Sequence, residues 1–192
     1  MIANGGVIAF RTDTFYGLGA DPFNAAAVAR IRELKGREEN KPILLLISDP
    51  EQVERLILER TESFTRAAAE FWPGPLTIIG RAVPTLPEAI TAGTGTVGVR
   101  LPADDAVREL VRECGGVLTA TSANPSGREP GRSASEVGSY FPHGLDLIVD
   151  GGAVTATEPS TVLDATTSPP RVVRAGVIHA DRIAQLTRRS SE

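Results

Sequence analysis

The spacing of hydrophobic positions changes repeatedly along the chain, and these changes predict alternating strands and helices. Short, continuous apolar runs are typical of buried strands, whereas apolar residues three and four positions apart predict helices. On this basis, strands are expected at residues 7–10, 43–47, 76–79, 97–101, 117–120, 147–149, 161–163 and 172–173.

Helical spacing occurs between and after these runs. Asn24 is expected to cap a helix that ends at Gly36, because Asn is favoured at helix starts and Gly at helix ends. Asp49 precedes Pro50 and lies three positions before Gln52, a capping-box pattern that predicts another helix start. Further helices are expected at 64–71, at 107–114, after the capping-box pattern of Ser133 and Glu136, and at 181–188.

Interleaved strands and helices predict an α/β (α+β) fold around a mixed sheet. The last strands have no helix between them, so part of the pairing is expected to be antiparallel. The length of 192 residues favours a single domain. That domain is expected over residues 1–180, with a C-terminal helical tail over 181–192. Pro and Gly residues between Arg81 and Thr96 predict a long irregular loop there.

Composition excludes several classes of protein. The net charge of −4 gives no overall basic field for nucleic acid. Cys114 has no second cysteine to pair with, and His143 and His179 are too far apart for a usual zinc spacing. No apolar run reaches the roughly 18 residues of a membrane span, and residues 1–10 lack a signal-peptide pattern. We therefore expect a cytoplasmic protein with no structural metal, no membrane association and a buried thiol at Cys114.

Residues 93–98 match the pattern G-x-G-x-x-G literally. A dinucleotide-binding loop of this type follows a strand and opens a helix, whereas this segment leads into the strand predicted at 97–101. It is therefore interpreted as a flexible loop whose backbone approaches another group. No Gly-Lys-Ser/Thr is present, and neither histidine has the context of a Ser-His-Asp hydrolase.

Three polar segments, residues 11–19, 35–42 and 119–127, follow a predicted strand or a helix end. Taken singly, each has an ordinary explanation: a turn, a compensated helix dipole or a Ser/Asn-rich loop. Together they supply hydroxyls, amides and cations without an evident general base. This combination indicates a bound polyanion and a small polar molecule. It also indicates chemistry driven by positioning and charge neutralisation, such as nucleotidyl or phosphoryl transfer.

A series of motifs then resembles one known family in its order and spacing. The motifs are T-D-T-F-Y-G-L-G at 12–19, K-G-R at 35–37 with K-P at 41–42, W-P-G-P-L-T at 72–77, V-R-L-P at 99–102, S-A-N with S-G at 122–127, S-T-V-L-D at 160–164 and R-A-G at 174–176. The chain is identified as resembling the YrdC-like family over residues 7–178. That resemblance implies a single-domain, twisted, mixed open sheet with helices around a concave cavity.

The resemblance also implies an activity. Within the family, the threonylcarbamoyl-AMP synthases are nucleotidyltransferases that combine L-threonine, bicarbonate and ATP, with Mg²⁺, and release pyrophosphate. Partner proteins then complete the threonylcarbamoyladenosine modification of tRNA. Two alternatives stay open: a YciO-like protein that binds tRNA or other double-stranded RNA without synthase activity, and a carbamoyl-transfer relative like the domain of hydrogenase maturation proteins.

Matching positions assign residue roles by resemblance. The implied catalytic residues are Lys35 and Arg37, and the implied threonine-binding residues are Thr14, Arg100 and Ser160. The implied ATP-binding residues are Lys35, Arg37, Lys41, Thr96, Ser122, Asn124 and Arg174. The chain departs from the family pattern at Arg11, Leu46 and Ala120. By comparison with that pattern, we also expect it to lack the helix that usually precedes the first strand and the C-terminal extension of longer members.

Overall fold

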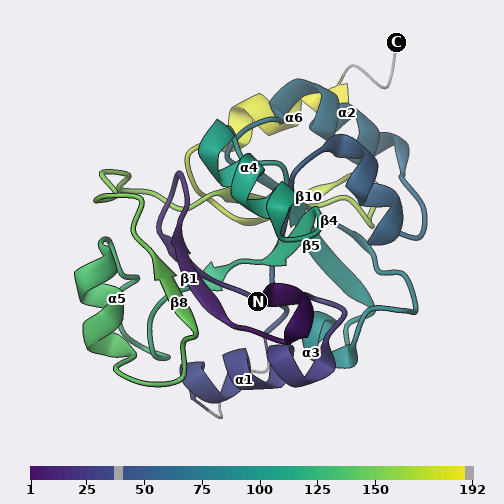
Figure 1. The fold of residues 1–192 in the computed structure, drawn as a ribbon. Coiled ribbons are helices and arrows are strands. Elements are labelled where there is room, and N and C mark those ends of the chain that lie inside the picture. Colours follow the sequence, from purple (N-terminus) through teal and green to yellow (C-terminus); the bar gives the residue numbers. More distant parts are fainter. Residues whose placement is uncertain (37–40, 189–192) are drawn as a thin grey trace.

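The structure of the protein is a computed structural model that describes residues 1–36 and 41–188. It consists of two mixed β-sheets with helices on their outer faces (Figure 1). The four-stranded sheet has the order β7-β2-β1-β8 and the six-stranded sheet the order β10-β9-β4-β5-β3-β6. The strands are β1 (Ile8–Arg11), β2 (Tyr16–Gly19), β3 (Leu45–Ile47), β4 (Leu76–Arg81), β5 (Thr96–Arg100), β6 (Val117–Thr119), β7 (Thr121–Ser122), β8 (Leu147–Val149), β9 (Thr161–Asp164) and β10 (Arg171–Arg174).

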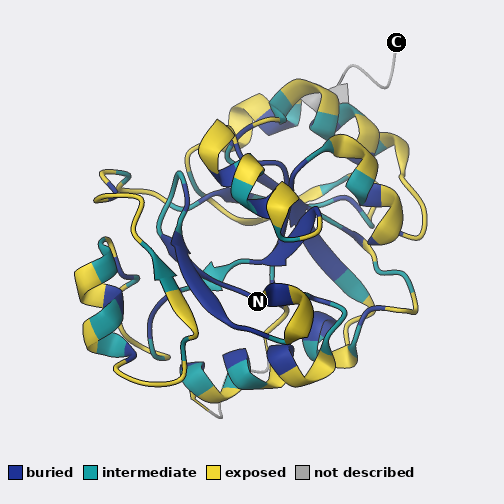
Figure 2. Cartoon of the chain, in the orientation of Figure 1, coloured by how far each residue is buried: buried dark blue, intermediate teal, exposed yellow. Residues whose placement is uncertain are grey.

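Figure 2 shows that the strands are largely buried, whereas the helices expose their outer faces. The helices are the short 3₁₀ segments η1 (Ile2–Asn4) and η2 (Pro50–Arg55), and α1 (Ala25–Lys35), α2 (Glu62–Phe71), α3 (Glu88–Thr91), α4 (Asp105–Glu113), α5 (Ala134–Tyr140) and α6 (Ala180–Arg188). Two predicted caps are present, because the side chain of Asn24 accepts from Ala27 N at 3.1 Å and that of Ser133 from Glu136 N at 3.2 Å.

Strand pairing is mixed, as expected. Strand β1 pairs antiparallel with β2 and parallel with β8, and β9 pairs antiparallel with β10 but parallel with β4. The two sheets are joined through Ala120, since β6 lies at the edge of one sheet and β7 at the edge of the other. Thr119 reinforces this junction: its backbone N donates to Ala20 O at 3.0 Å and its hydroxyl accepts from Ala20 N at 2.8 Å.

The six-stranded sheet has two different faces. Because side chains alternate across a strand, one set belongs to the main hydrophobic core: Leu45, Ile47, Leu76, Ile78, Val97 and Val99. The alternate set lines a cavity: Leu46, Thr77, Ile79, Gly98, Arg100, Val162 and Arg174. One face of the sheet therefore builds the core, and the other is available for chemistry.

Three local predictions were wrong. The side chain of Asp49 caps no helix; it pairs instead with Arg112 of α4 at 2.9 Å, and only a 3₁₀ segment follows it. The ion pair with Arg112 therefore occupies the carboxylate of Asp49, which would otherwise cap the helix. The loop predicted between Arg81 and Thr96 contains the short helix α3, and the polar segments 11–19 and 119–127 contain strands β2 and β7. Ladder bonds to neighbouring strands compensate for their weak local strand signal.

Cys114 is half-buried and packs against the smaller hydrophobic cluster, which includes Val107, Val111 and Leu118. Burial raises the pKa of its thiol, so the thiol stays protonated near neutral pH. The expectation of a buried thiol therefore holds only in part.

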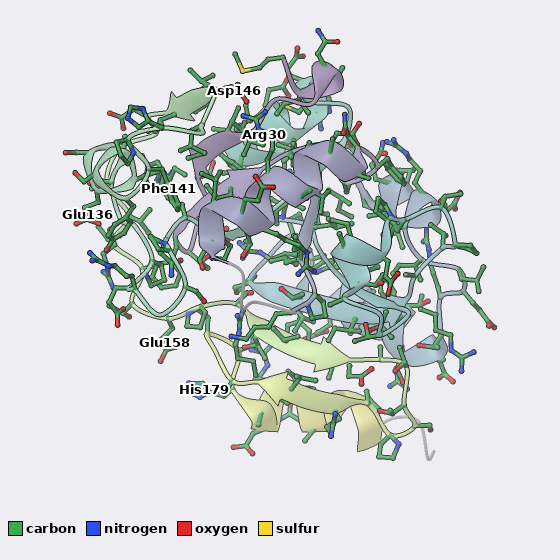
Figure 3. The ribbon with its side chains drawn as sticks, turned by 90° about the horizontal axis from the view of Figure 1, so that it is seen from below. Arg30, Glu136, Phe141, Asp146, Glu158 and His179 are labelled. Atoms are coloured by element: carbon green, nitrogen blue, oxygen red, sulfur yellow. The ribbon has the colours of Figure 1, made fainter. Side chains whose placement is uncertain are left out.

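Figure 3 shows Arg30 of α1 close to Asp146, which lies just before β8. Their ion pair measures 2.9 Å, and the carboxylate of Asp146 also accepts from Val7 N at 2.6 Å. The bond from the Val7 amide is the main cause of the lowered pKa of Asp146, with a smaller contribution from Arg30. Asp146 thus ties α1 and the start of β1 to the segment that leads into β8.

The C-terminal helix α6 packs against α2. Ile183 is buried in the main core, and Arg182 pairs with Glu70 of α2 at 3.2 Å. Among the described helices, none is long and apolar enough to cross a membrane.

Gly19, the second glycine of the segment Y-G-L-G, has a steric role that can be tested. A Cβ on Gly19 would lie 2.7 Å from the ring of Phe10, which is fully buried. We expect Gly19→Ala to lower the free energy of unfolding by about 1–3 kcal/mol through overpacking, measured by urea denaturation.

Gly138→Ala is the matched control. A Cβ on Gly138 in α5 would make an ordinary contact of 3.6 Å with Ile148. Because Ala is a better helix former than Gly, this variant is expected to be neutral or up to about 1 kcal/mol more stable. Equal losses of stability in both variants would contradict the steric explanation for Gly19.

Candidate active site

A cavity of about 530 Å³ lies against the second face of the six-stranded sheet. Its floor comes from β3, β4, β5, β9 and β10. Its walls come from β2 and β7 of the other sheet, from the end of α1 and from residues 41–44. Ala120, which joins the two sheets, also lines the cavity, so the cavity lies where the two sheets meet.

The lining is strongly cationic. It contains the side chains of Arg32, Lys35, Lys41, Arg100 and Arg174, and none of the described lining residues is an Asp or a Glu. Like charges at close range repel each other unless an anion lies among them. The cavity is therefore suited to a ligand with several negative charges.

Arg100, at the end of β5, is the most deeply buried of these cations, with 2% of its surface exposed. It forms an ion pair with Asp13 and a long contact of 3.5 Å with the hydroxyl of Thr14, whereas its buried Nε has no partner among the described residues. Burial, and to a lesser extent the charge of Arg174, lowers the pKa of Arg100 to about 10. The group is still charged at neutral pH and has a donor left for a ligand.

Arg174, at the end of β10, lies at the rim and remains partly exposed. Its Nη2 donates to the carbonyl of Ser160 at 2.8 Å and to the hydroxyl of Ser160 at 3.0 Å. The surrounding protein atoms desolvate the guanidinium group and lower its pKa. The Ser160 hydroxyl is also within 3.0 Å of the Thr77 hydroxyl, which connects Arg174 to the floor of the cavity.

Lys35 is the last residue of α1, and its aliphatic stem is buried. The ammonium group donates to the carbonyl oxygens of Ser122 at 2.8 Å and Asn124 at 3.1 Å. These contacts join the end of α1 to the segment after β7. The cation is therefore held in place before any ligand arrives, and a fixed charge loses little entropy on binding.

The T-D-T segment is a tight turn built on Thr12. The buried Thr12 hydroxyl donates to Phe15 O at 2.6 Å and accepts from the backbone N atoms of Thr14 and Phe15 at 3.2 Å. This turn directs Asp13 toward Arg100 and brings Thr14 into the cavity lining. A common type of turn, stabilised by a hydroxyl group, thus positions Asp13 and Thr14 at the cavity.

The structure brings seven of the predicted site residues together in the cavity lining: Thr14, Lys35, Lys41, Arg100, Ser122, Ser160 and Arg174. Arg37 lies outside the described residues. Asn124 and Thr96 are not part of the lining. Asn124 is buried and donates to Pro125 O and Arg128 O, which shapes its loop. Thr96 bonds to the Thr94 hydroxyl at 2.9 Å, where the glycine-rich loop leads into β5.

The predicted site residues did not include five polar residues that line the cavity: Thr12, Tyr16, Arg32, Thr77 and Thr121. Arg32 lies one helical turn before Lys35, so the helical spacing of the two cations was an available signal. It donates to Ala89 O at 3.0 Å through Nε, and it contacts Lys41 O at 3.4 Å. Thr77 is the last residue of W-P-G-P-L-T. Its position in the strand does not by itself show whether the side chain lies on the core face or the cavity face of the sheet.

The three departures from the family pattern have different positions. Arg11 does not line the cavity; it pairs with Asp104, the N-cap of α4, at 2.8 Å. Leu46 and Ala120 do line it. Leu46 is aligned with Arg100 across the β3–β5 pair, so it gives the cation an apolar neighbour.

Metal binding by the protein itself has little support in this site. In the described parts of the chain, no group of three or more His, Cys, Asp or Glu side chains could hold a metal ion. Hard cations such as Mg²⁺ prefer carboxylate and phosphate oxygens, and the described lining offers no carboxylate. Within the described lining, the oxygen ligands of a Mg²⁺ ion would have to come from the bound ligand.

The fold and the cavity define an α/β protein with a cavity lined by cations, and comparison with known proteins identifies its family. A Sua5/YciO/YrdC family model, described as "Telomere recombination", matches residues 1–176. Threonylcarbamoyl-AMP synthase of Pyrococcus abyssi is 38% identical over 185 residues, which cover 96% of this chain and 54% of that protein. The synthase of Halorhodospira halophila is 36% identical over 163 residues, 85% of each chain.

Solved structures agree with this comparison. The structure of P. abyssi Sua5 complexed with L-threonine has a TM-score of 0.91 and 38% identity, covering 96% of this chain and 54% of that one. The structure of E. coli YciO has a TM-score of 0.84 and 26% identity, covering 95% and 88%. This chain spans about half the length of the P. abyssi protein. The present chain belongs to the Sua5/YciO/YrdC family. This result confirms both the family resemblance of its motifs and the predicted fold class.

Proposed function

We propose that the protein is a threonylcarbamoyl-AMP synthase, which forms threonylcarbamoyl-adenylate and pyrophosphate from L-threonine, bicarbonate and ATP. The observation that carries this proposal is a cavity with five cations and several hydroxyls, whose described lining has no carboxylate. All of the proposed reactants except threonine are anions, and threonine has a carboxylate. Relatives at 36–38% identity that carry this name support the same activity.

The threonine site is proposed at the floor. Arg100 provides a fixed charge whose Nε is still available, and Thr14 and Ser160 place hydroxyls in the same lining. A guanidinium group binds a carboxylate in a defined orientation. Arg100 would therefore hold the carboxylate of threonine and direct its amino group away from the floor.

The ATP site is proposed nearer the rim. Lys35 is fixed by two carbonyl oxygens, Arg174 lies at the end of β10 and Lys41 is exposed at the cavity wall. These cations, with the hydroxyl of Ser122, suit a chain of phosphates. Arg37 stays a proposed member of this site through the family resemblance alone, as does Thr96. Asn124 would act by shaping the loop that Lys35 contacts.

The chemistry requires positioning more than a strong base. The amino group of threonine would condense with bicarbonate to form a carbamate and water. An oxygen of the carbamate would then attack the α-phosphorus of ATP, and pyrophosphate would leave. Lys35, Arg174 and Lys41 would offset the charge that develops on the phosphates. Mg²⁺ bound to ATP would supply further charge neutralisation when present.

We further propose, from the family resemblance, that partner proteins transfer the threonylcarbamoyl group to tRNA. The alternative of a YciO-like protein that only binds RNA is less well supported, because Lys35 and Arg100 are buried. A nucleic-acid backbone is bound by accessible cations along a surface, and a double helix cannot enter a cavity of about 530 Å³.

Pyrophosphate release is the test of this function. We expect release from ATP that requires both L-threonine and bicarbonate, measured with a coupled phosphate assay and with each reactant omitted in turn. Threonine-independent release would indicate simple ATP hydrolysis. If no release occurs and tRNA binds tightly with a steep salt dependence, the RNA-binding alternative replaces the synthase.

A further inference from the structure

The hydroxyl groups of Thr77 and Ser160 form a buried pair in the cavity floor. The residues are 3% and 2% exposed, and their oxygens are 3.0 Å apart. Thr77 is on β4 and Ser160 directly precedes β9, two strands that lie side by side in parallel. Neither comparison with known proteins nor the sequence motifs assign Thr77 a role.

Counting donors and acceptors shows that this pair has one proton to spare. Each hydroxyl has one hydrogen to donate, and the bond between the two hydroxyls uses only one of them. Arg174 donates to Ser160 Oγ at 3.0 Å, which occupies an acceptor position there and adds no second acceptor for the pair. A buried polar group without a partner is costly. The remaining proton therefore suits an acceptor atom of a ligand.

A second unused donor belongs to the residue that lies opposite Thr77 in the sheet. Ile78 pairs with Val99 and Ile79 with Gly98 in the antiparallel ladder, so Thr77 comes opposite Arg100 on the same face of the sheet. Arg100 Nε is buried and unpartnered among the described residues. Two neighbouring donors, one of them charged, match the two oxygens of a single carboxylate.

The orientation of Thr77 is fixed by packing. A Cβ on Gly98 would lie 3.0 Å from the methyl group of Thr77, so the absence of a side chain at Gly98 provides the space that this methyl occupies. β-Branched side chains have few accessible rotamers. With its methyl held against Gly98, Thr77 keeps its hydroxyl directed at Ser160.

We infer that Thr77 is a positioning residue: it holds the Ser160 hydroxyl so that this hydroxyl and Arg100 Nε together bind the carboxylate of the amino acid substrate. This inference rests on the proposed function for the identity of the amino acid. Thr77 itself acts through Ser160, and the charge of Arg174 on the other side of Ser160 completes the arrangement.

The test is calorimetric titration of L-threonine into Thr77→Val, which keeps the branched shape and removes the hydroxyl. Loss of one hydrogen bond is expected to weaken threonine binding about threefold to tenfold, and Thr77→Ser should restore most of it. In turnover assays the KM for threonine should rise by the same factor, with kcat and the KM for ATP little changed.

Thr161→Val is the matched control. Thr161 is the next residue after Ser160, is fully buried and bonds Ile178 from the other face of the sheet. The same chemical change there should lower stability without changing threonine affinity. Wild-type affinity in Thr77→Val, equal losses in Thr77→Val and Thr77→Ser, or an equal loss in Thr161→Val would each overturn the inference.

Two further titrations separate the possible failures. L-2-Aminobutyrate has the carboxylate but not the side-chain hydroxyl, so Thr77→Val should weaken its binding by the same factor. If Thr77→Val binds L-2-aminobutyrate as tightly as the wild type does, the hydroxyl pair interacts with the hydroxyl of threonine, and the carboxylate assignment is wrong. If the wild type binds threonine but releases no pyrophosphate, the synthase proposal fails while the role of Thr77 is still judged by binding. If the wild type binds no threonine, the inference fails.

Discussion

Arg100→Lys is expected to reduce kcat/KM for threonine by about tenfold to a hundredfold, the loss that corresponds to about 1.5–3 kcal/mol for one charge-assisted hydrogen bond. Lysine keeps a positive charge near Asp13 but cannot present the planar fork of arginine. It is also more readily neutralised in a site that is 2% exposed. The measurement is the dependence of pyrophosphate release on threonine concentration.

Two controls make this prediction specific to the site. Arg60→Lys alters an arginine that pairs with Glu54 at the surface, 3.3 Å away, and should leave the kinetics unchanged. ATP binding to Arg100→Lys, measured by calorimetry, should stay close to that of the wild type. A folded Arg100→Lys variant with an unchanged KM for threonine would show that Arg100 does not bind the amino acid.

Lys35→Met is expected to weaken ATP binding by about tenfold to a hundredfold, again the effect of losing a charge-assisted contact. Methionine has a similar length and no charge, so the volume of the side chain is largely kept. The variant should also unfold at a lower temperature, because the carbonyl oxygens of Ser122 and Asn124 lose a donor. A buried acceptor left unsatisfied costs about 1–3 kcal/mol. This cost is expected at Asn124 O, because Ser122 O still accepts from Asn124 N at 3.0 Å.

ATP affinity must be measured at a temperature at which Lys35→Met is fully folded, confirmed by circular dichroism. Arg60→Met is the control, because it removes a cation from the surface rather than from the cavity. Threonine binding to Lys35→Met should be little affected, since Arg100 holds the floor independently. An unchanged ATP affinity in the folded variant would remove Lys35 from the phosphate site.

Much of the local structure could be predicted because its causes are local. The cap at Asn24 and the helix end at Gly36 depend on a few neighbouring residues, and both are observed. The predicted capping box at Asp49 failed because Arg112, which is 63 positions away, binds its carboxylate. Strand β7 could not be predicted, since its short polar sequence becomes a strand only by pairing with β2.

The site shows the same division. Lys35, Arg100, Ser160 and Arg174 were identified from motifs, and all four line the cavity. Thr77 was not identified. The alternation of side chains along a strand shows which residues share a face, but it does not show which face borders the cavity. Arg32 was overlooked although its spacing from Lys35 placed both on one side of α1.

The sequence by itself determined which segments form most strands and helices, which family the motifs resemble and which residue types are available for an anionic ligand. Those properties depend on backbone propensity, periodicity and capping, which act over a few residues. The tertiary structure decided that Arg100 of β5 and Arg174 of β10 border one cavity, with β4 and β9 between them. Strand order depends on how distant segments bury their apolar faces together, so it is a property of the whole chain rather than of any motif.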